Sequence, residues 1–161
     1  MKTLSDTKVN LSEQTRAQVT SILNQLLADL SDLCSQCKQA HWNVRGSLFY
    51  PLHKVFDDLA ESIGGHLDPL AERITALGGV ASGTVRQAAA LSALPEFPHG
   101  PSEGLAYVTA MIDRFGLAAN AVRKAIDDTA ALGDAGTADL LTGVSQDLDK
   151  GLWFLEAHTR S

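Results

Sequence analysis

The sequence is poor in aromatic residues, in basic residues and in long apolar runs, and each shortage excludes a class of protein. Aromatic residues make up 6% of the 161 residues, which favours helix over sheet because strands are enriched in aromatic side chains. No apolar run approaches the roughly 18 residues of a membrane span, and the N-terminal residues lack the apolar stretch of a secretory signal. With 13 basic and 19 acidic residues the net charge is −6, so non-specific nucleic-acid binding would need a local basic arm.

Cysteine is also scarce, since only Cys34 and Cys37 occur, in a single C-x-x-C. That spacing can serve redox chemistry or form half of a zinc site. The sequence has no second C-x-x-C and no βαβ pattern near it. Both residues fall in a helical pattern one turn apart, so we favour small apolar side chains near the core over the redox interpretation.

The composition that remains, 45% hydrophobic and 20% charged, is that of a globular domain. We expect one domain over residues 1–161, with residues 1–10 as a short flexible arm. Apolar residues at three- and four-residue steps predict four long helices. These run from Leu11 to Asn43, from Leu48 or Leu52 to Leu77, from Ser102 to Leu132 and from Thr137 to His158.

The connections between these helices define the predicted architecture. The first and third are short, whereas the second covers residues 78–102 and has room for a short helix from Arg86 to Leu91. Four long helices with one long crossover describe an all-α, ferritin-like four-helix bundle.

Five residues in and before the second helix have the chemistry of metal ligands. They are His41, His53, Asp57, Asp68 and Glu72. His53 and Asp57 are four residues apart, as are Asp68 and Glu72, so each pair shares a helix face. Imidazole nitrogen together with carboxylate oxygen suits iron and, less selectively, zinc or manganese.

One chain cannot bring the two pairs together. Asp57 and Asp68 are 11 residues apart on one helix, which separates them by about 16 Å along its axis. They can meet if a second copy of the helix packs antiparallel across a two-fold axis, which creates two equivalent sites. The alternative is that these are charges on a solvated helix face.

The same spacing places the two-fold axis near Ser62 and Ile63. The two sites would then lie about 22 Å apart. Gly64 and Gly65 fall close to the axis, where glycine allows two backbones to approach, although each costs about 1 kcal/mol in a helix interior.

Several segments of the chain resemble the Dps family of miniferritins. They are KQAHWNVRG, LHKVFD, HLDPLAERITALGG, NAVRKAI and QDLDKGLWFLE, and the resemblance extends from about residue 14 to residue 158. The five-residue pattern matches the family's ferroxidase site in residue type and in spacing. The resemblance implies that His41, His53 and Asp57 come from one subunit, and Asp68 and Glu72 from its two-fold partner.

The resemblance also implies a function. Members of the family form hollow dodecamers, oxidise Fe(II) with hydrogen peroxide or oxygen, store the ferric mineral and protect DNA during starvation and oxidative stress. We therefore expect a ferroxidase with iron as its metal, in the bacterial cytoplasm, with nucleoid association as a further expectation. The family's pores suggest that Asp134 and Asp139 admit iron, although helix N-terminal acids also complement the helix dipole. Trp42 is a candidate radical quencher, with a packed core aromatic as the alternative.

One residue departs from a regular helix, because Pro69 lies between Asp68 and Glu72. A proline inside a helix removes one hydrogen bond and clashes with the preceding turn, at a cost of about 3 kcal/mol. We favour a kinked but continuous helix. The alternative is a break at Gly64 and Gly65, with Asp68 capping a new helix.

Two other functions remain to be weighed. Some relatives bind DNA through a lysine-rich N-terminal arm, but this arm has only Lys2 and Lys8, so we expect DNA binding to be weak or absent. A nucleoid-compacting protein in which iron oxidation is secondary is therefore the alternative function. A dimerising helical scaffold without chemistry would leave the five-residue match unexplained.

Overall fold

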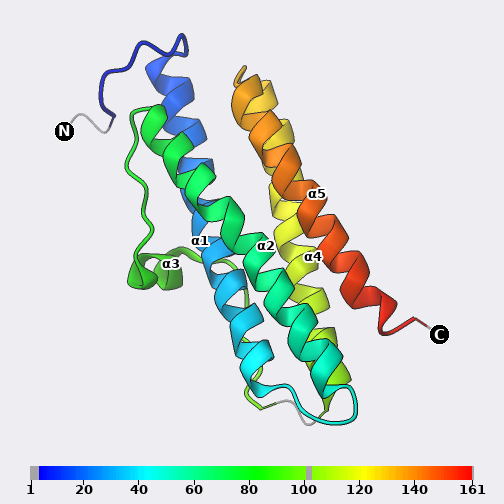
Figure 1. Ribbon diagram of the computed structural model, residues 1–161. Coiled ribbons are helices and arrows are strands. Elements are labelled where there is room, and N and C mark those ends of the chain that lie inside the picture. The colour runs from blue at the N-terminus through cyan, green and yellow to red at the C-terminus, as the bar shows by residue number, and fades with distance from the viewer. Residues whose placement is uncertain (1–3, 101–102, 161) are drawn as a thin grey trace.

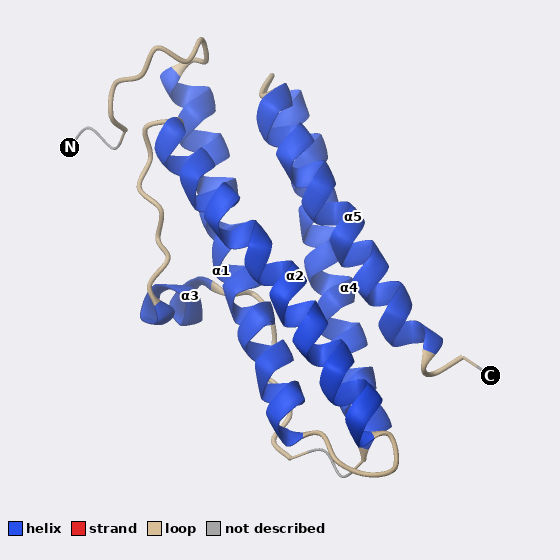
Figure 2. Ribbon diagram, viewed as in Figure 1, coloured by secondary structure: helices blue, strands red, loops and turns tan. Residues whose placement is uncertain are grey.

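The structure is a computed structural model that describes residues 4–100 and 103–160. These residues form five helices and no strand (Figures 1 and 2): α1 (Glu13–Asn43), α2 (Phe49–Ala76), α3 (Val85–Leu91), α4 (Gly104–Ala131) and α5 (Ala135–Ala157). The predicted all-α architecture is confirmed, with α3 as the short helix of the long crossover. The predicted helix ends agree to within two residues, except that Leu52, the second of the two starts predicted for α2, lies three residues inside it. The predicted start at Ser102 lies outside the described residues.

Local sequence signals begin and end these helices. The Ser12 hydroxyl caps α1 by accepting from the Thr15 backbone N–H at 3.0 Å, which satisfies one of the orphan donors of the first turn. Thr84 and Gln87 form a reciprocal capping box that starts the short α3. Gly133, with φ +84°, lets the chain reverse between α4 and α5.

The bundle consists of two antiparallel pairs, α1 with α2 and α4 with α5 (Figure 1). Phe56 of α2 and Phe115 of α4 are fully buried where the pairs meet. A Cβ at Gly151 of α5 would lie 2.7 Å from Phe115 and 2.9 Å from Leu59. The absence of a side chain at Gly151 therefore allows α5 to pack closely against the core.

Polar side chains of α1 fix the crossover along the outside of the bundle. The buried carboxylate of Asp29 accepts from the Ala93 backbone N–H at 2.8 Å, and Asp32 accepts from the Ser92 hydroxyl at 2.6 Å. These bonds satisfy the backbone and side-chain groups of a segment that has little helix of its own. The crossover consequently lies along α1, on the side away from α4 and α5 (Figure 1).

The described part of the N-terminal arm also has specific contacts. Leu4 is buried, and the Ser5 backbone N–H donates to the Gly78 carbonyl at 2.7 Å. Arg16 donates from Nη1 to the carbonyls of Ser5 and Leu77 at 3.1 and 2.8 Å. Residues 4 and 5 therefore lie fixed against the end of α2, although we expected a flexible arm over residues 1–10.

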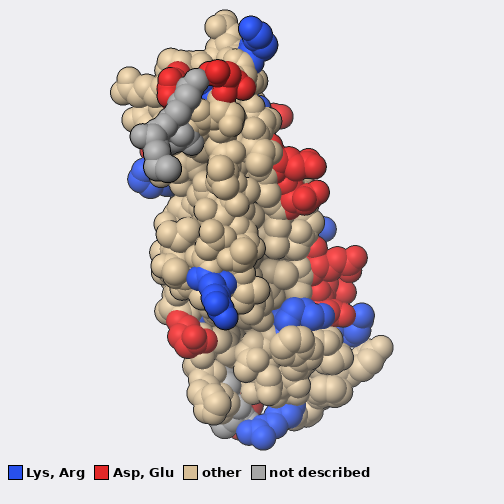
Figure 3. Space-filling model, turned by 90° about the vertical axis from the view of Figure 1, so that its left-hand side faces the viewer, with Lys and Arg blue, Asp and Glu red and all other residues tan. Residues whose placement is uncertain are grey.

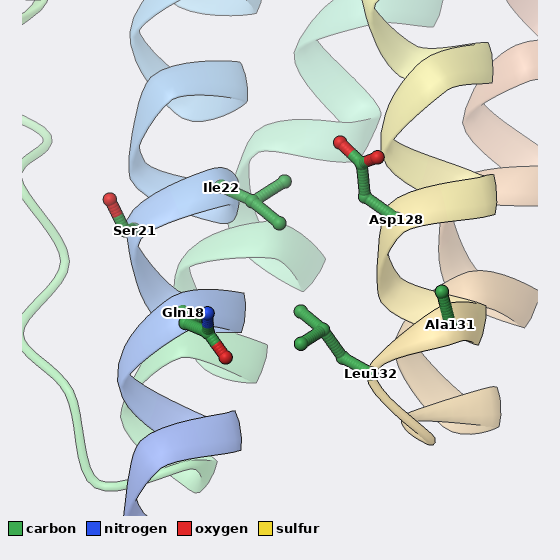
Figure 4. A pocket seen from close by; sticks show the side chains of 6 residues that line it. All are labelled: Gln18, Ser21, Ile22, Asp128, Ala131 and Leu132. Atoms are coloured by element: carbon green, nitrogen blue, oxygen red, sulfur yellow. The ribbon is translucent and has the colours of Figure 1, made fainter.

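A groove of about 490 Å³ separates α1 from α4 near the end of the bundle where α1 begins. Figure 4 shows Ile22 of α1 and Leu132 after α4 pointing into it. Its other lining residues are Gln18, Ser21, Asp128 and Ala131. None of the five predicted metal ligands lies in this groove.

Candidate metal centre

His41 near the end of α1 and His53 in α2 form a stacked pair with ring centroids 3.7 Å apart. His41 Nδ1 lies 2.7 Å from the backbone carbonyl of His53, and His53 Nδ1 lies 2.9 Å from the carbonyl of His41. A carbonyl oxygen only accepts, so both Nδ1 atoms carry the proton in these bonds. Both Nε2 atoms therefore keep a lone pair, which is the form in which histidine binds a metal ion.

Asp57 lies one turn after His53, and its carboxylate contacts a lysine of α1. Lys38 Nζ is 2.6 Å from Asp57 Oδ1, and His41 Nδ1 is 4.0 Å from the same oxygen. The Lys38 hydrogen bond is the main reason why the pKa of Asp57 lies below its usual range. Asp57 is thus kept in the anionic form that a metal ion requires.

Lys38 is the residue at this site that the sequence reasoning missed. It lies three residues before His41 and therefore on the same side of α1. This spacing was the available signal in the sequence. It leads to an ion pair with Asp57 only when the packing of α1 against α2, which places Lys38 opposite Asp57, is known.

Asp68 and Glu72 are exposed on the C-terminal half of α2. Helix α2 is continuous from Phe49 to Ala76 with Pro69 inside it. The predicted continuous helix is confirmed, and the alternative in which Asp68 caps a new helix is wrong. Asp68 is consequently not engaged in capping.

The structure brings together three of the five predicted ligands. His41, His53 and Asp57 lie at one end of the α1–α2 pair, whereas Asp68 and Glu72 lie about 16 Å or more along α2. Within residues 4–100 and 103–160, no three His, Cys, Asp or Glu side chains are grouped closely enough to hold a metal ion. A closed site formed with a second subunit stays a prediction.

The three other predicted site residues differ in their surroundings. Trp42 is 67% exposed, so it is not a core aromatic of the protomer. Asp134 is 3% exposed; it caps α5 through the Thr137 N–H at 3.0 Å and pairs with Arg73 at 2.7 Å. Asp134 therefore lies at the N-terminus of α5, as in the alternative of a helix N-terminal acid, and its side chain also caps the helix. Asp139 is exposed on the first turns of α5.

The thiols of the C-x-x-C lie between α1 and α2. Cys37 is fully buried, and the half-buried Cys34 donates from Sγ to the Ala60 carbonyl at 3.4 Å. Burial raises the pKa of both thiols, which keeps them protonated and poorly nucleophilic. This environment supports the interpretation as small apolar side chains.

Helix α2 also pairs with α5 away from these ligands. His66 Nε2 lies 2.8 Å from an oxygen of Asp147.

None of the helices within residues 4–100 and 103–160 has the length and hydropathy of a membrane span.

The chain is similar to a ferritin-like family model and to proteins named for DNA protection during starvation. The family model of the ferritin-like domain matches residues 20–161. A "DNA protection during starvation protein" of Agrobacterium fabrum is 41% identical over 154 residues, which cover 96% of this chain and 95% of the relative. A "DNA protection during starvation protein 2" of Bacillus anthracis is 33% identical over 141 residues, which cover 87% of this chain and 95% of the relative.

Solved structures agree in fold. DpsC from Streptomyces coelicolor superposes with a TM-score of 0.93 at 32% identity and covers 100% of this chain and 94% of its own. A Dps of Mycobacterium smegmatis superposes with a TM-score of 0.93 at 29% identity and covers 98% of this chain and 94% of its own.

Proposed function

Because this chain belongs to the Dps family of ferritin-like proteins, we propose that it oxidises Fe(II) at sites shared between two subunits and stores the ferric product inside a hollow dodecamer. Iron is the substrate and cargo, and hydrogen peroxide or oxygen is the oxidant. One peroxide accepts one electron from each of two ferrous ions and, with two protons, yields two waters and two ferric ions. Transfer of both electrons at one site avoids release of hydroxyl radical, which is how such a protein protects DNA in the bacterial cytoplasm.

The reciprocal hydrogen bonds of His41 and His53 carry this proposal most directly. Each ring is fixed by the backbone of the other residue, so two neutral nitrogen ligands are oriented before any metal ion arrives. A ligand whose ring is already oriented by a hydrogen bond loses little entropy on binding, and removal of such a hydrogen bond weakens metal affinity by about 10–100-fold. The stacked pair of His41 and His53, which two hydrogen bonds join and whose Nε2 atoms are free, has no evident role in core packing.

The carboxylates would complete the site from two subunits. Asp57 adds an anionic oxygen beside the histidines, and the partner's Asp68 and Glu72 would add two more. Three carboxylates neutralise much of the charge of incoming Fe(II) and stabilise Fe(III) more strongly, which favours oxidation. Lys38 must release Asp57 when iron binds, and until then its ammonium balances the charge of the half-site.

The surroundings of Gly65 support the two-fold arrangement. Gly65 is exposed on α2, and a Cβ placed there would meet no atom of the protomer within 4 Å. Packing within one chain therefore gives no reason for glycine here, whereas close approach of a second α2 does.

We also propose a route for iron and a role for Trp42. The exposed Asp139 would attract cations toward a three-fold opening of the cage. Trp42, next to His41 and exposed in the protomer, would reduce stray oxidising species.

DNA binding is the second candidate function, and we expect it to be weak or absent. Of the two basic residues of the arm, Lys8 is exposed, and Lys2 lies outside the described residues. Residues 4 and 5 are bonded to the end of α2, and the net charge is −6. A mobility shift with duplex DNA at low and moderate salt tests this expectation, because phosphate contacts give a steep salt dependence.

Iron loading with peroxide, followed by size exclusion with light scattering, tests the principal function. Twelve chains of 17.1 kDa give a particle of about 205 kDa, and ferric absorbance should elute with it. The double variant Asp68→Ala, Glu72→Ala should form the same particle without rapid oxidation. A monomeric wild type, or unchanged oxidation in the double variant, would overturn the shared site.

A further inference from the structure

Trp42 near the end of α1 and Val80 at the beginning of the crossover are both strongly exposed apolar side chains. Trp42 is 67% exposed and Val80 is 76% exposed. Figure 3 views the molecule from the left-hand side of Figure 1 and shows a broad uncharged area in the middle of this face, with acidic side chains along its right-hand edge. The two side chains are too far apart to form one patch, so what they could contact is decided by their levels along the bundle.

Trp42 lies level with the His53–Asp57 end of α2. It directly follows His41, whose ring stacks on His53. It also lies one turn after Lys38, which reaches across to Asp57 at 2.6 Å. Residues four apart share a helix face, so Trp42 is on the side of α1 from which Lys38 reaches the predicted ligands.

Val80 lies level with the other ligand pair. Its carbonyl accepts from Asn24 Nδ2 at 3.1 Å, so Val80 is beside Asn24 of α1. Asn24 is eight residues after Arg16, which donates to the Leu77 carbonyl. Because α1 and α2 are antiparallel, Asn24 lies level with the residue about eight before Leu77, between Asp68 and Glu72.

We infer that Trp42 of each subunit packs against Val80 of the partner subunit and forms an apolar wall on the α1 side of each iron site. This inference rests on the proposed two-fold arrangement, which places the His53–Asp57 pair of one subunit opposite the Asp68–Glu72 pair of the other. Trp42 is level with the first pair and Val80 with the second, so the axis brings Trp42 level with the partner's Val80. The same contact occurs twice in the dimer.

This wall would act on the site through His41. Fixing Trp42 fixes the end of α1 on which the His41 backbone and ring depend. It also excludes water from one side of the two metal positions, and a drier site strengthens the attraction between carboxylates and cations. Trp42 and Val80 are thus positioning residues. Their contact forms when two subunits assemble, and it closes the iron site at the same time.

Cross-linking with a matched control tests the contact. Both variants carry Cys34→Ala and Cys37→Ala; one adds Trp42→Cys and Val80→Cys, and the other adds Trp42→Cys alone. Within one chain, positions 42 and 80 are about 25 Å apart along the bundle, so a short bismaleimide can join them only between subunits. In the control, the two cysteines introduced at position 42 of a dimer have no cysteine within reach, because the two sites with which they are level lie about 22 Å apart.

The first variant should give covalent dimers on a denaturing gel in high yield, and the second should give at least tenfold less. Light scattering and peroxide-driven iron oxidation are measured on both before the reagent is added. Failure of the 42–80 cross-link in an assembled, iron-oxidising protein overturns the Trp42–Val80 contact and leaves the proposed function intact. A wild-type protein that is monomeric and does not oxidise iron overturns both the contact and the proposed function.

Fluorescence gives a second readout that needs no cysteine. The chain has two tryptophans, so Trp153→Phe leaves Trp42 as the only emitter. Its emission should be blue-shifted in the assembled protein, and Val80→Asp should shift it to the red and raise acrylamide quenching several-fold. Leu117→Asp, at an exposed position on α4, should change neither. Fully exposed emission from Trp42 in an intact assembly contradicts the inference.

Discussion

His41 and His53 each donate Nδ1–H to the backbone carbonyl of the other, across rings stacked 3.7 Å apart. This symmetrical arrangement joins the end of α1 to the beginning of α2. It fixes the tautomer of both rings, so each Nε2 is available to a metal ion. The geometry of half the site is therefore set by the same bonds that hold the two helices in register.

His53→Ala should slow peroxide-driven iron oxidation by about 10–100-fold, because it removes one nitrogen ligand and the group that orients the other. Stopped-flow absorbance of the ferric product measures this rate. His66→Ala is the matched control, since it removes a histidine of the same helix that pairs with Asp147 instead. It should oxidise iron at the wild-type rate. Equal rates for all three proteins would show that His53 is not a ligand.

Lys38→Met should raise the pKa of Asp57 toward its ordinary value, because the Lys38 hydrogen bond is the main cause of its lowering. A lowered carboxyl pKa in the fold stabilises the protein above the pKa of the unfolded chain, and this contribution is lost as pH falls through the lowered value. Because Lys38 occupies the Asp57 oxygen that a metal ion would bind, the variant should bind Co²⁺, an unreactive substitute for Fe(II), several-fold more tightly at neutral pH. That gain should disappear as the pH falls to the ordinary pKa of a carboxyl group and Asp57 is protonated. A pH series of calorimetric titrations measures both effects. Lys54→Met, the control, should change the affinity less.

Gly65→Leu should prevent assembly without unfolding the protomer. The protomer has open space at Gly65, and leucine is the better helix former by nearly 1 kcal/mol. Light scattering should show loss of the dodecamer, while circular dichroism keeps its helical signal. Gly143→Leu, at an exposed position of α5 with equally open space, should still assemble. A Gly65→Leu dodecamer would place the two-fold axis elsewhere.

Asp134→Ala and Asp139→Ala should have separate effects. The first removes the cap of α5 and the buried partner of Arg73, so it should cost about 1–3 kcal/mol of stability. The second removes an exposed charge and should leave the melting temperature unchanged while slowing the uptake of iron several-fold. Thermal melts and the initial rate of mineral formation distinguish them. Unchanged uptake in Asp139→Ala would remove it from the proposed route.

Periodicity was enough to predict the helices, because apolar residues at three- and four-residue steps and glycines at the turns act locally. It was also enough to place His53 and Asp57 on one face, and the structure agrees. Pro69 needed the structure, because whether a helix continues through proline depends on the space left by the preceding turn. Lys38 and the contacts of Arg16 needed it too, since both depend on how α1 and α2 pack.

Asp134 illustrates a different limit. An acid at the beginning of a helix has the same sequence signature whether it caps that helix or faces an opening. Burial decides between them, and only the fold gives burial. Trp42 is the converse case, because an apolar residue beside a ligand suggests a core position until its exposure is known.

His53 and Glu72 of one chain are too far apart along α2 to serve the same iron site, and this separation has a genetic consequence. A His53→Ala chain and a Glu72→Ala chain would each oxidise iron slowly alone, because every proposed shared site in either homodimer lacks one ligand. In a mixed dimer, one site collects both defects and the other collects none. Random mixing of the two chains should therefore restore about a quarter of the wild-type sites. Two defective variants of the same gene would therefore restore activity when they are expressed together. Such complementation is impossible when one chain contains the whole site.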